Sequence, residues 1–244
     1  MSNRDSNRVH PSVPILFEDN HVLGVAKPVN VPSQEDATGD PDMLTILKQD
    51  IKERYNKPGN VYLGLVHRLD RPVGGAMVFA KTSKAASRLS EAVRSRNFHK
   101  QYAAIVHGIP SKSSGRLHDY LLKDTKTNTV RVVPKGTDGA KEALLDYTVL
   151  ESKNGLSLVL IELHTGRPHQ IRVQFSHAEN PLYGDQKYGS KVNQAGQQIA
   201  LWSVRVGFPH PTTKDEVNIL STPPAVHPWS QFSMDALMRT LESQ

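Results

Sequence analysis

A cluster of charged side chains separates two apolar runs in the segment Leu65–Ser83, LVHRLDRPVGGAMVFAKTS. In this cluster the carboxylate Asp70 stands between Arg68 and Arg71. If the apolar runs are strands of one sheet, Asp70 is partly buried and needs a cation, because an unpaired buried carboxylate is costly. An ionised aspartate held beside arginine in a cleft can act as a nucleophile or as a base. The alternative is an ordinary surface turn in which Asp70 pairs with a neighbouring arginine.

Other kinds of chemistry have weaker support in the sequence. His164, His169 and His177 lack the i, i+4 spacing of a helical zinc site, and the chain has no cysteine to assist them. The glycines around Gly74 match neither a phosphate-binding loop nor a dinucleotide fingerprint. No serine or cysteine stands in a signature of acyl transfer. We therefore expect no metal site and keep Asp70 as the candidate reactive group.

Composition limits the class of protein and of partner. The 244 residues suit one sizeable domain, and the absence of cysteine excludes disulfides and favours a reducing, cytoplasmic setting. The formal net charge of +6 favours a polyanionic partner, of which nucleic acid is the commonest, although charge alone does not decide this. No apolar run is long enough to cross a membrane. The polar start predicts a disordered tail over residues 1–12, followed by one domain over 13–244.

The elements that must position Asp70 alternate between short strands and a few helices. Asp42 and either Thr82 or Ser83 can cap helices, and Asn154-Gly155 predicts a tight hairpin turn. A third helix is expected from Pro168 onward and a fourth over 230–243. Strands are expected within 15–27, at 61–66, 76–80 and 100–108, within 116–164 and at 199–208. The pattern predicts an α+β fold with a mixed, largely antiparallel sheet.

Four stretches together resemble the RluA family of RNA pseudouridine synthases. HRLDRPVGGAMVFAKTSKAA resembles the family's catalytic motif, in which HRLD supplies the essential aspartate, here Asp70. EDNHVLGVAKPVNVPS resembles its N-terminal Lys-Pro segment, and KQYAAIVHG resembles the strand that carries its active-site tyrosine. TGRPHQIRVQFSHAENPLYGDQKYG resembles its arginine-bearing helix and following loop. The matches follow the family's order and cover most of residues 15–210.

The resemblance implies a pseudouridine synthase fold with a central cleft flanked by helices, and isomerisation of uridine to pseudouridine within RNA. It makes Asp70 the catalytic carboxylate, as nucleophile or as base, and pairs Arg172 with it. Tyr102 would lie against a flipped-out uracil and is a candidate to assist proton removal, while Ile171 would form an apolar wall. Arg68 would fill the gap left by the flipped base or hold a phosphate. The reaction needs no cofactor.

The match has departures. Val73, Gly74 and Gly75 occupy slots where the family usually has Thr-Ser-Gly, and Gln174 stands where it often has histidine. We expect no S4 RNA-binding domain before the catalytic sequence, and therefore expect the catalytic domain itself to contact RNA, through Lys123, Lys126, Arg131 and Lys135.

The expected partner is ribosomal or transfer RNA, bound by a monomer. One alternative function is an RNA-binding or assembly factor of the same fold that has lost catalysis. A carboxylate glycosidase would need a second acidic group near the first. The matched segments offer only Asp185, which we interpret as a residue that braces its loop.

Overall fold

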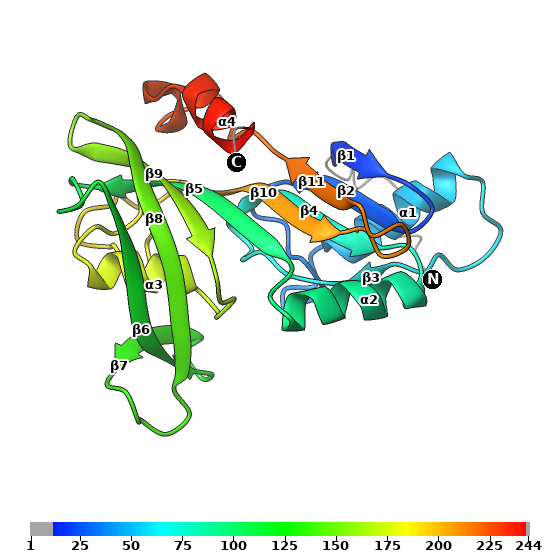
Figure 1. Cartoon of the computed structure of the whole chain (residues 1–244), viewed down its shortest axis with the longest axis horizontal. Coiled ribbons are helices and arrows are strands. Elements are labelled where there is room, and N and C mark those ends of the chain that lie inside the picture. Colours follow the sequence, from blue (N-terminus) through cyan, green and yellow to red (C-terminus); the bar gives the residue numbers. More distant parts are fainter. Residues whose placement is uncertain (1–11, 243–244) are drawn as a thin grey trace, which may run out of the picture.

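The structure, a computed structural model, describes residues 12–242 (Figure 1). The tail predicted over residues 1–12 therefore lies almost wholly outside the described part. The helices of the described part are α1 (Met43–Arg54), α2 (Ser83–Arg94), α3 (Gln170–His177), the short 3₁₀ helix η1 (Trp229–Gln231) and α4 (Met234–Glu242). Its strands are β1 (Ile15–Glu18), β2 (Val22–Lys27), β3 (Gly64–Leu65), β4 (Gly74–Ala80), β5 (His99–His107), β6 (Ser114–Asp124), β7 (Thr129–Val133), β8 (Lys141–Lys153), β9 (Leu156–Leu163), β10 (Leu201–Pro209) and β11 (Glu216–Leu220).

All described strands belong to one sheet with the order β1-β2-β4-β10-β5-β9-β8-β6-β7, to which β11 adds beside β10 and β3 beside β4. Only the β4–β10 pair is parallel. The predicted mixed, largely antiparallel α+β fold is thus confirmed. Strands β6, β7 and β8 extend away from the rest of the sheet as an arm, which we call the β6–β8 arm (Figure 1).

Local sequence signals act as expected where they are strong. The Asp42 carboxylate accepts hydrogen bonds from the first-turn amides of α1, and the Thr82 hydroxyl does the same for α2. Asn154 and Gly155 both have positive φ, 54° and 74°, between β8 and β9, as a tight hairpin turn requires.

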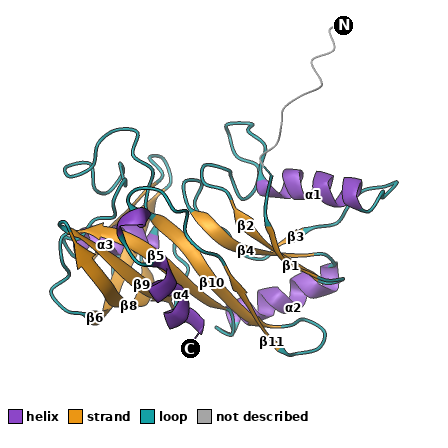
Figure 2. Ribbon diagram, turned by 90° about the horizontal axis from the view of Figure 1, so that it is seen from above, coloured by secondary structure: helices purple, strands orange, loops and turns teal. Residues whose placement is uncertain are grey.

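The helices cover both faces of the sheet. On β5, Tyr102 and Ala104 belong to a core cluster that includes side chains of α1 and α3, whereas Ala103 and Ile105 pack with α4. This alternation follows from the two-residue period of a strand. Figure 2 shows α1 and α2 on opposite sides of the sheet formed by β1, β2 and β4. Tyr102 therefore shares its face with α3, the helix that carries Arg172.

Four expectations about elements need correction. The strand expected at 61–66 is reduced to β3, and β11 was not expected. Helix α3 begins at Gln170 and not at Pro168, because His169 adopts a left-handed conformation with φ of 51°. The helix expected over 230–243 is divided, since extended backbone at Phe232 separates η1 from α4.

Candidate active site

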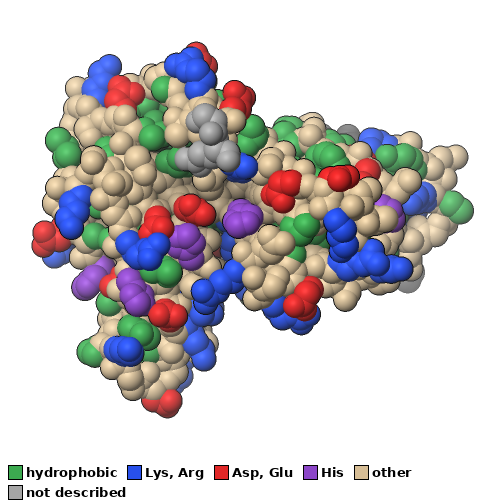
Figure 3. Space-filling view, viewed as in Figure 1, with side chains coloured by type: hydrophobic (Ala, Val, Ile, Leu, Met, Phe, Trp, Pro, Cys, Tyr) green, Lys and Arg blue, Asp and Glu red, His purple; other side chains and the backbone are tan. Residues whose placement is uncertain are grey.

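A cleft of about 1400 Å³ lies between the β6–β8 arm and the part of the molecule that carries α2. Lys and Arg side chains gather on the side of the arm that faces this hollow (Figure 3). The five site residues expected from the sequence all line the cleft: Arg68, Asp70, Tyr102, Ile171 and Arg172. They come from three separate segments, namely the β3–β4 connection, β5 and α3.

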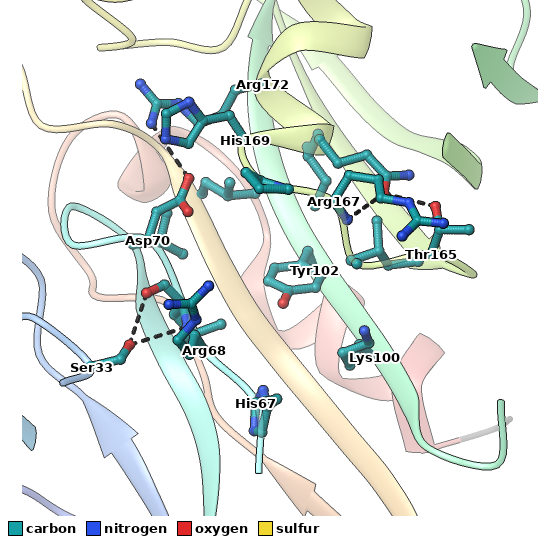
Figure 4. A pocket seen from close by; sticks show the side chains of 18 of the residues that line it. Ser33, His67, Arg68, Asp70, Lys100, Tyr102, Thr165, Arg167, His169 and Arg172 are labelled. Carbon is teal, nitrogen blue, oxygen red and sulfur yellow. Dashed lines mark hydrogen bonds and ion pairs between the residues drawn. The ribbon is translucent and has the colours of Figure 1, made fainter. Parts of the chain in front are cut away.

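The Asp70 loop is braced on its neighbours. The Ser33 hydroxyl donates to the carbonyl of buried Leu69 at 2.8 Å and accepts from its amide at 3.2 Å. Arg71 pairs with Asp36 and Asp40 on the loop that follows β2. These contacts leave the Asp70 carboxylate about 29% exposed in the cleft, so it is accessible to a ligand (Figure 4).

Arg172 binds two carboxylates, and the closer one is not Asp70. Its Nε and Nη2 donate to the two oxygens of Asp185 at 2.8 Å each, and its Nη1 reaches Asp70 Oδ2 at 3.4 Å. Burial opposes the charge of Arg172, but the Asp185 hydrogen bonds and the charges of Asp185 and Asp70 outweigh it and raise the pKa of the guanidinium. Arg172 therefore remains a fixed cation beside Asp70.

Asp185 is completely buried and also accepts the amides of Lys187 and Tyr188. It braces its loop, in keeping with the interpretation from the sequence, and it also orients Arg172. A carboxylate that is enclosed and already paired in this way cannot serve as the second acid of a glycosidase, which must face the substrate.

Tyr102 and Ile171 provide the enclosed, largely apolar part of the cleft. Both side chains are buried, at 6% and 5% exposure. Burial, reinforced by the negative charge of Asp70, raises the pKa of the Tyr102 phenol far above its usual range. The phenol thus keeps its proton at any physiological pH, which suits packing and hydrogen-bond donation.

Lys27 is a buried lysine near Asp70 to which no role was assigned from the sequence. Its side chain is fully buried at the end of β2, and its Nζ donates to the carbonyls of Pro28 and Arg71 at 2.9 and 3.1 Å. Burial lowers the pKa of Lys27 to about 7 against the opposing influence of Asp70. The Lys-Pro pair in the matched N-terminal segment was the sequence feature that could have pointed to Lys27. Because Lys27 and Asp70 are far apart in sequence, their proximity could not be predicted from it.

His67 is a neutral histidine that lines the cleft three residues before Asp70. Its Nε2 accepts the Val78 amide at 3.0 Å, so the ring hydrogen belongs on Nδ1. Burial, together with the charge of Lys100, lowers the pKa of His67 to about 3. This neutral ring braces the start of the Asp70 loop against β4.

Two departures from the family pattern have structural explanations. A side chain at Gly74 would meet the ring of Trp202 at 2.3 Å, so the glycine admits this indole beside β4. Gln174 donates to Asp119 at 2.8 Å and accepts from Gln170 at 3.0 Å, so it ties α3 to β6. Neither departure disturbs the carboxylate or its arginine.

The three histidines considered as metal ligands are not grouped into a metal site. His164 bonds to Asp146, and His169 bonds to Tyr188. Across residues 12–242, no group of three or more histidine and acidic side chains is placed to hold a metal ion. In the same range, no helix has the length and apolar character of a membrane span.

The cleft thus brings together a carboxylate beside a fixed arginine, an aromatic wall and an aliphatic wall. Residues 21–177 match the family model described as RNA pseudouridylate synthase, and the chain belongs to this family. The family and the enzyme class expected from the sequence, an isomerase that converts uridine in RNA to pseudouridine, are confirmed at this level.

Curated relatives support the assignment. The chain is 34% identical over 212 residues to an uncharacterized RNA pseudouridine synthase, YhcT of Bacillus subtilis, covering 86% of this chain and 68% of the relative. It is 33% identical to ribosomal large subunit pseudouridine synthase C of Buchnera aphidicola, with 86% and 66% covered. It is 36% identical to ribosomal large subunit pseudouridine synthase D of Yersinia pestis, with 72% and 53% covered. The chain thus spans between about half and two thirds of the length of these relatives.

Solved structures agree on the fold. Human RNA pseudouridylate synthase domain containing 1 superposes with a TM-score of 0.74 at 23% identity, covering 96% of both chains. Human RNA pseudouridylate synthase domain containing 4 gives the same TM-score and identity over 86% of this chain and 88% of that one. The pseudouridine synthase fold expected from the sequence is therefore confirmed.

Proposed function

We propose that this protein isomerises uridine to pseudouridine at defined positions of structured ribosomal or transfer RNA, with Asp70 as the catalytic carboxylate. The observation that carries the proposal is the convergence of Asp70, Arg172, Tyr102 and Ile171 in one cleft from distant parts of the chain. The names of two relatives favour ribosomal RNA of the large subunit as the first substrate to test.

The proposed reaction starts with a uridine that leaves its base stack, because a stacked uracil cannot rotate. The bond from the uracil nitrogen to the sugar breaks, the base turns, and a new bond forms at carbon 5, whose hydrogen is lost while the nitrogen gains one. Asp70 acts either as a nucleophile on the sugar or as a base at the adjacent ribose carbon. Both roles need the ionised carboxylate, which the nearby Arg172 favours.

The walls of the cleft suit an uncharged, planar base. Ile171 and Tyr102 enclose it, and the raised pKa of Tyr102 favours packing against the uracil over proton removal by a phenolate. Arg68 is exposed at the cleft and has no ion-pair partner among the described residues, so it is available to fill the vacated stack or to contact a phosphate. The proposed reaction uses no cofactor.

The remaining parts of the proposal concern the surroundings of the enzyme. We expect a monomer that works in the cytoplasm. The alternative is an inactive RNA-binding or assembly factor. The cleft does not support it, because Asp70, Tyr102 and Arg172 all line the cleft.

The test is the variant Asp70→Asn, which preserves the shape of the side chain and removes its charge and nucleophilic oxygen. Pseudouridine is measured by chemical mapping in unmodified ribosomal and transfer RNA incubated with the protein. We expect wild type to form it at a defined position and Asp70→Asn to form none, while circular dichroism and RNA affinity stay unchanged. Asp50→Asn, which removes a surface carboxylate of α1 outside the cleft, is the matched control. Comparable turnover by Asp70→Asn would exclude Asp70 from the chemistry.

A further inference from the structure

The cleft extends past Tyr102 to Lys100, and we call this part of it the Lys100 pocket. Lys100 and Tyr102 are two residues apart on β5, so their side chains project from the same face about 6.6 Å apart. Figure 4 shows Tyr102 between Asp70 and Lys100, with His67 on the opposite wall. The residues that define the Lys100 pocket are His67, Arg94, Arg96, Phe98, Lys100 and Gly166.

Lys100 is a half-buried cation, and no carboxylate in the described part of the chain pairs with it. Three other cations of the cleft, Arg71, Arg116 and Arg172, each bind aspartate, whereas Arg68 resembles Lys100 in having no ion-pair partner in the described part of the chain. The Lys100 Nζ lies beside Gly166, where an added Cβ would be 3.2 Å from it. Burial lowers the pKa of this ammonium, and an anionic ligand would reverse that effect.

None of the residues that define the Lys100 pocket is acidic; the nearest cleft-lining carboxylate on a neighbouring strand is Glu162 of β9, opposite Gln101. His67 is neutral, and its Nδ1 is a buried atom with no partner in the described residues. Arg94 and Arg96 also line the cleft; Arg94 pairs with Glu91, whereas Arg96 has no ion-pair partner within residues 12–242. A half-buried cation, a neutral donor and an arginine without an ion-pair partner suit an anion that arrives with the substrate.

We propose that Lys100 binds a phosphate group of the RNA backbone directly adjacent to the target uridine. One strand repeat separates Lys100 from Tyr102, a distance comparable with the size of one nucleotide, so a uracil against Tyr102 brings its own phosphate to the Lys100 Nζ. The inference rests on the proposed function, because it takes the uracil to lie against Tyr102. Lys100 is then a positioning residue that anchors the flipped nucleotide, separate from Arg68.

Mononucleotides test the contact without catalysis. Binding of uridine, uridine 3′-monophosphate and uridine 5′-monophosphate is followed by NMR titration of the labelled protein. We expect wild type to bind one monophosphate about tenfold more tightly than uridine, as for a charge-assisted contact, and the preferred isomer identifies which phosphate is held. Lys100→Met should lose this preference, Lys100→Arg should keep most of it, and the exposed α2 variant Lys84→Met should keep all of it. Equal affinities in wild type, or a preference that survives in Lys100→Met, would overturn the inference.

The titration of Lys100 itself gives a second readout that a merely structural role would not move. In wild type, NMR of the lysine side-chain signals should show the pKa of Lys100 rising when the preferred monophosphate is added. With oligouridine bound to Asp70→Asn protein, Lys100→Met should lower the slope of log affinity against log salt by about 0.7, the value for one phosphate of a single strand. An unchanged pKa and slope would refute the contact. Because none of these measurements depends on turnover, an inactive wild type would contradict the proposed function separately.

Discussion

Arg172 and Asp185 form a buried bidentate ion pair in which both nitrogen–oxygen distances are 2.8 Å. This pair fixes the plane of the guanidinium, so that only the remaining nitrogen is free to face Asp70, at 3.4 Å. Asp185 is in turn held by two backbone amides of its own loop. The arginine beside the candidate catalytic carboxylate is thus positioned by a second carboxylate that does not face the cleft.

Asp185→Asn should therefore lower both stability and activity. Removing one charge leaves Arg172 buried without its main partner, which costs about 3 kcal/mol or more in the free energy of unfolding. Single-turnover rates should fall at least about tenfold, because the guanidinium loses its fixed orientation. Urea unfolding and rapid-quench assays measure the two effects, with Asp50→Asn as the control for loss of an exposed pair. Equal unfolding midpoints for the two variants would contradict the role of this pair.

Arg172→Met should damage the chemical step more than Arg68→Met. Without Arg172, Asp70 and Asp185 lose their shared cation, and the pKa of the pair should rise. Asp70 is then protonated in part of the molecules, so part of the activity should return as pH rises. Arg68→Met should chiefly weaken productive binding, which excess enzyme offsets. Single-turnover rates across pH separate the two. The assignment of the two arginines would be reversed if the rate loss in Arg172→Met does not change with pH, or if Arg68→Met slows the single-turnover rate more than Arg172→Met does.

Lys27 should make stability depend on pH above neutrality. Its pKa is about 7 in the folded protein and 10.5 when exposed, so between these values the unfolded chain binds more protons than the native one. Stability therefore rises with pH across this window, by up to about 1.4 kcal/mol per pH unit from this group. The free energy of unfolding of wild type, compared with Lys27→Met from pH 7 to pH 10, isolates the contribution. A difference between the two proteins that is constant with pH would show that Lys27 is not a buried, neutralised amine.

RNA binding should depend strongly on salt, but the four basic residues expected to contact RNA should not contribute equally. Lys123 lines the cleft, whereas Arg131 pairs opposite Leu122 and so projects from the other face of the β6–β7 ribbon. Lys123→Met should reduce the slope of log affinity against log salt by about 0.7 to 0.9, and Arg131→Met should leave it unchanged. Filter binding between low and moderate salt measures both. A flat salt dependence in wild type would show that phosphate contacts contribute little to RNA binding.

The local elements and the reactive group could be predicted from the sequence because they depend on near neighbours. Asp42 and Thr82 cap the helices that follow them, and Asn154-Gly155 makes its hairpin through positive φ angles. The motif around Asp70 supplied the candidate carboxylate, and the order of the matched segments supplied the family.

The contacts that complete the site were decided by the tertiary structure. The Ser33 brace on Leu69, the Lys27 bonds to the Arg71 carbonyl and the approach of Lys100 to Gly166 join residues far apart in sequence. Their distances follow from the order of strands in the sheet, which no local pattern encodes. The tertiary structure also decided that Arg172 lies closer to Asp185 than to Asp70. A buried guanidinium pairs with the carboxylate that packing brings closest, and here that carboxylate is on the Asp185 loop.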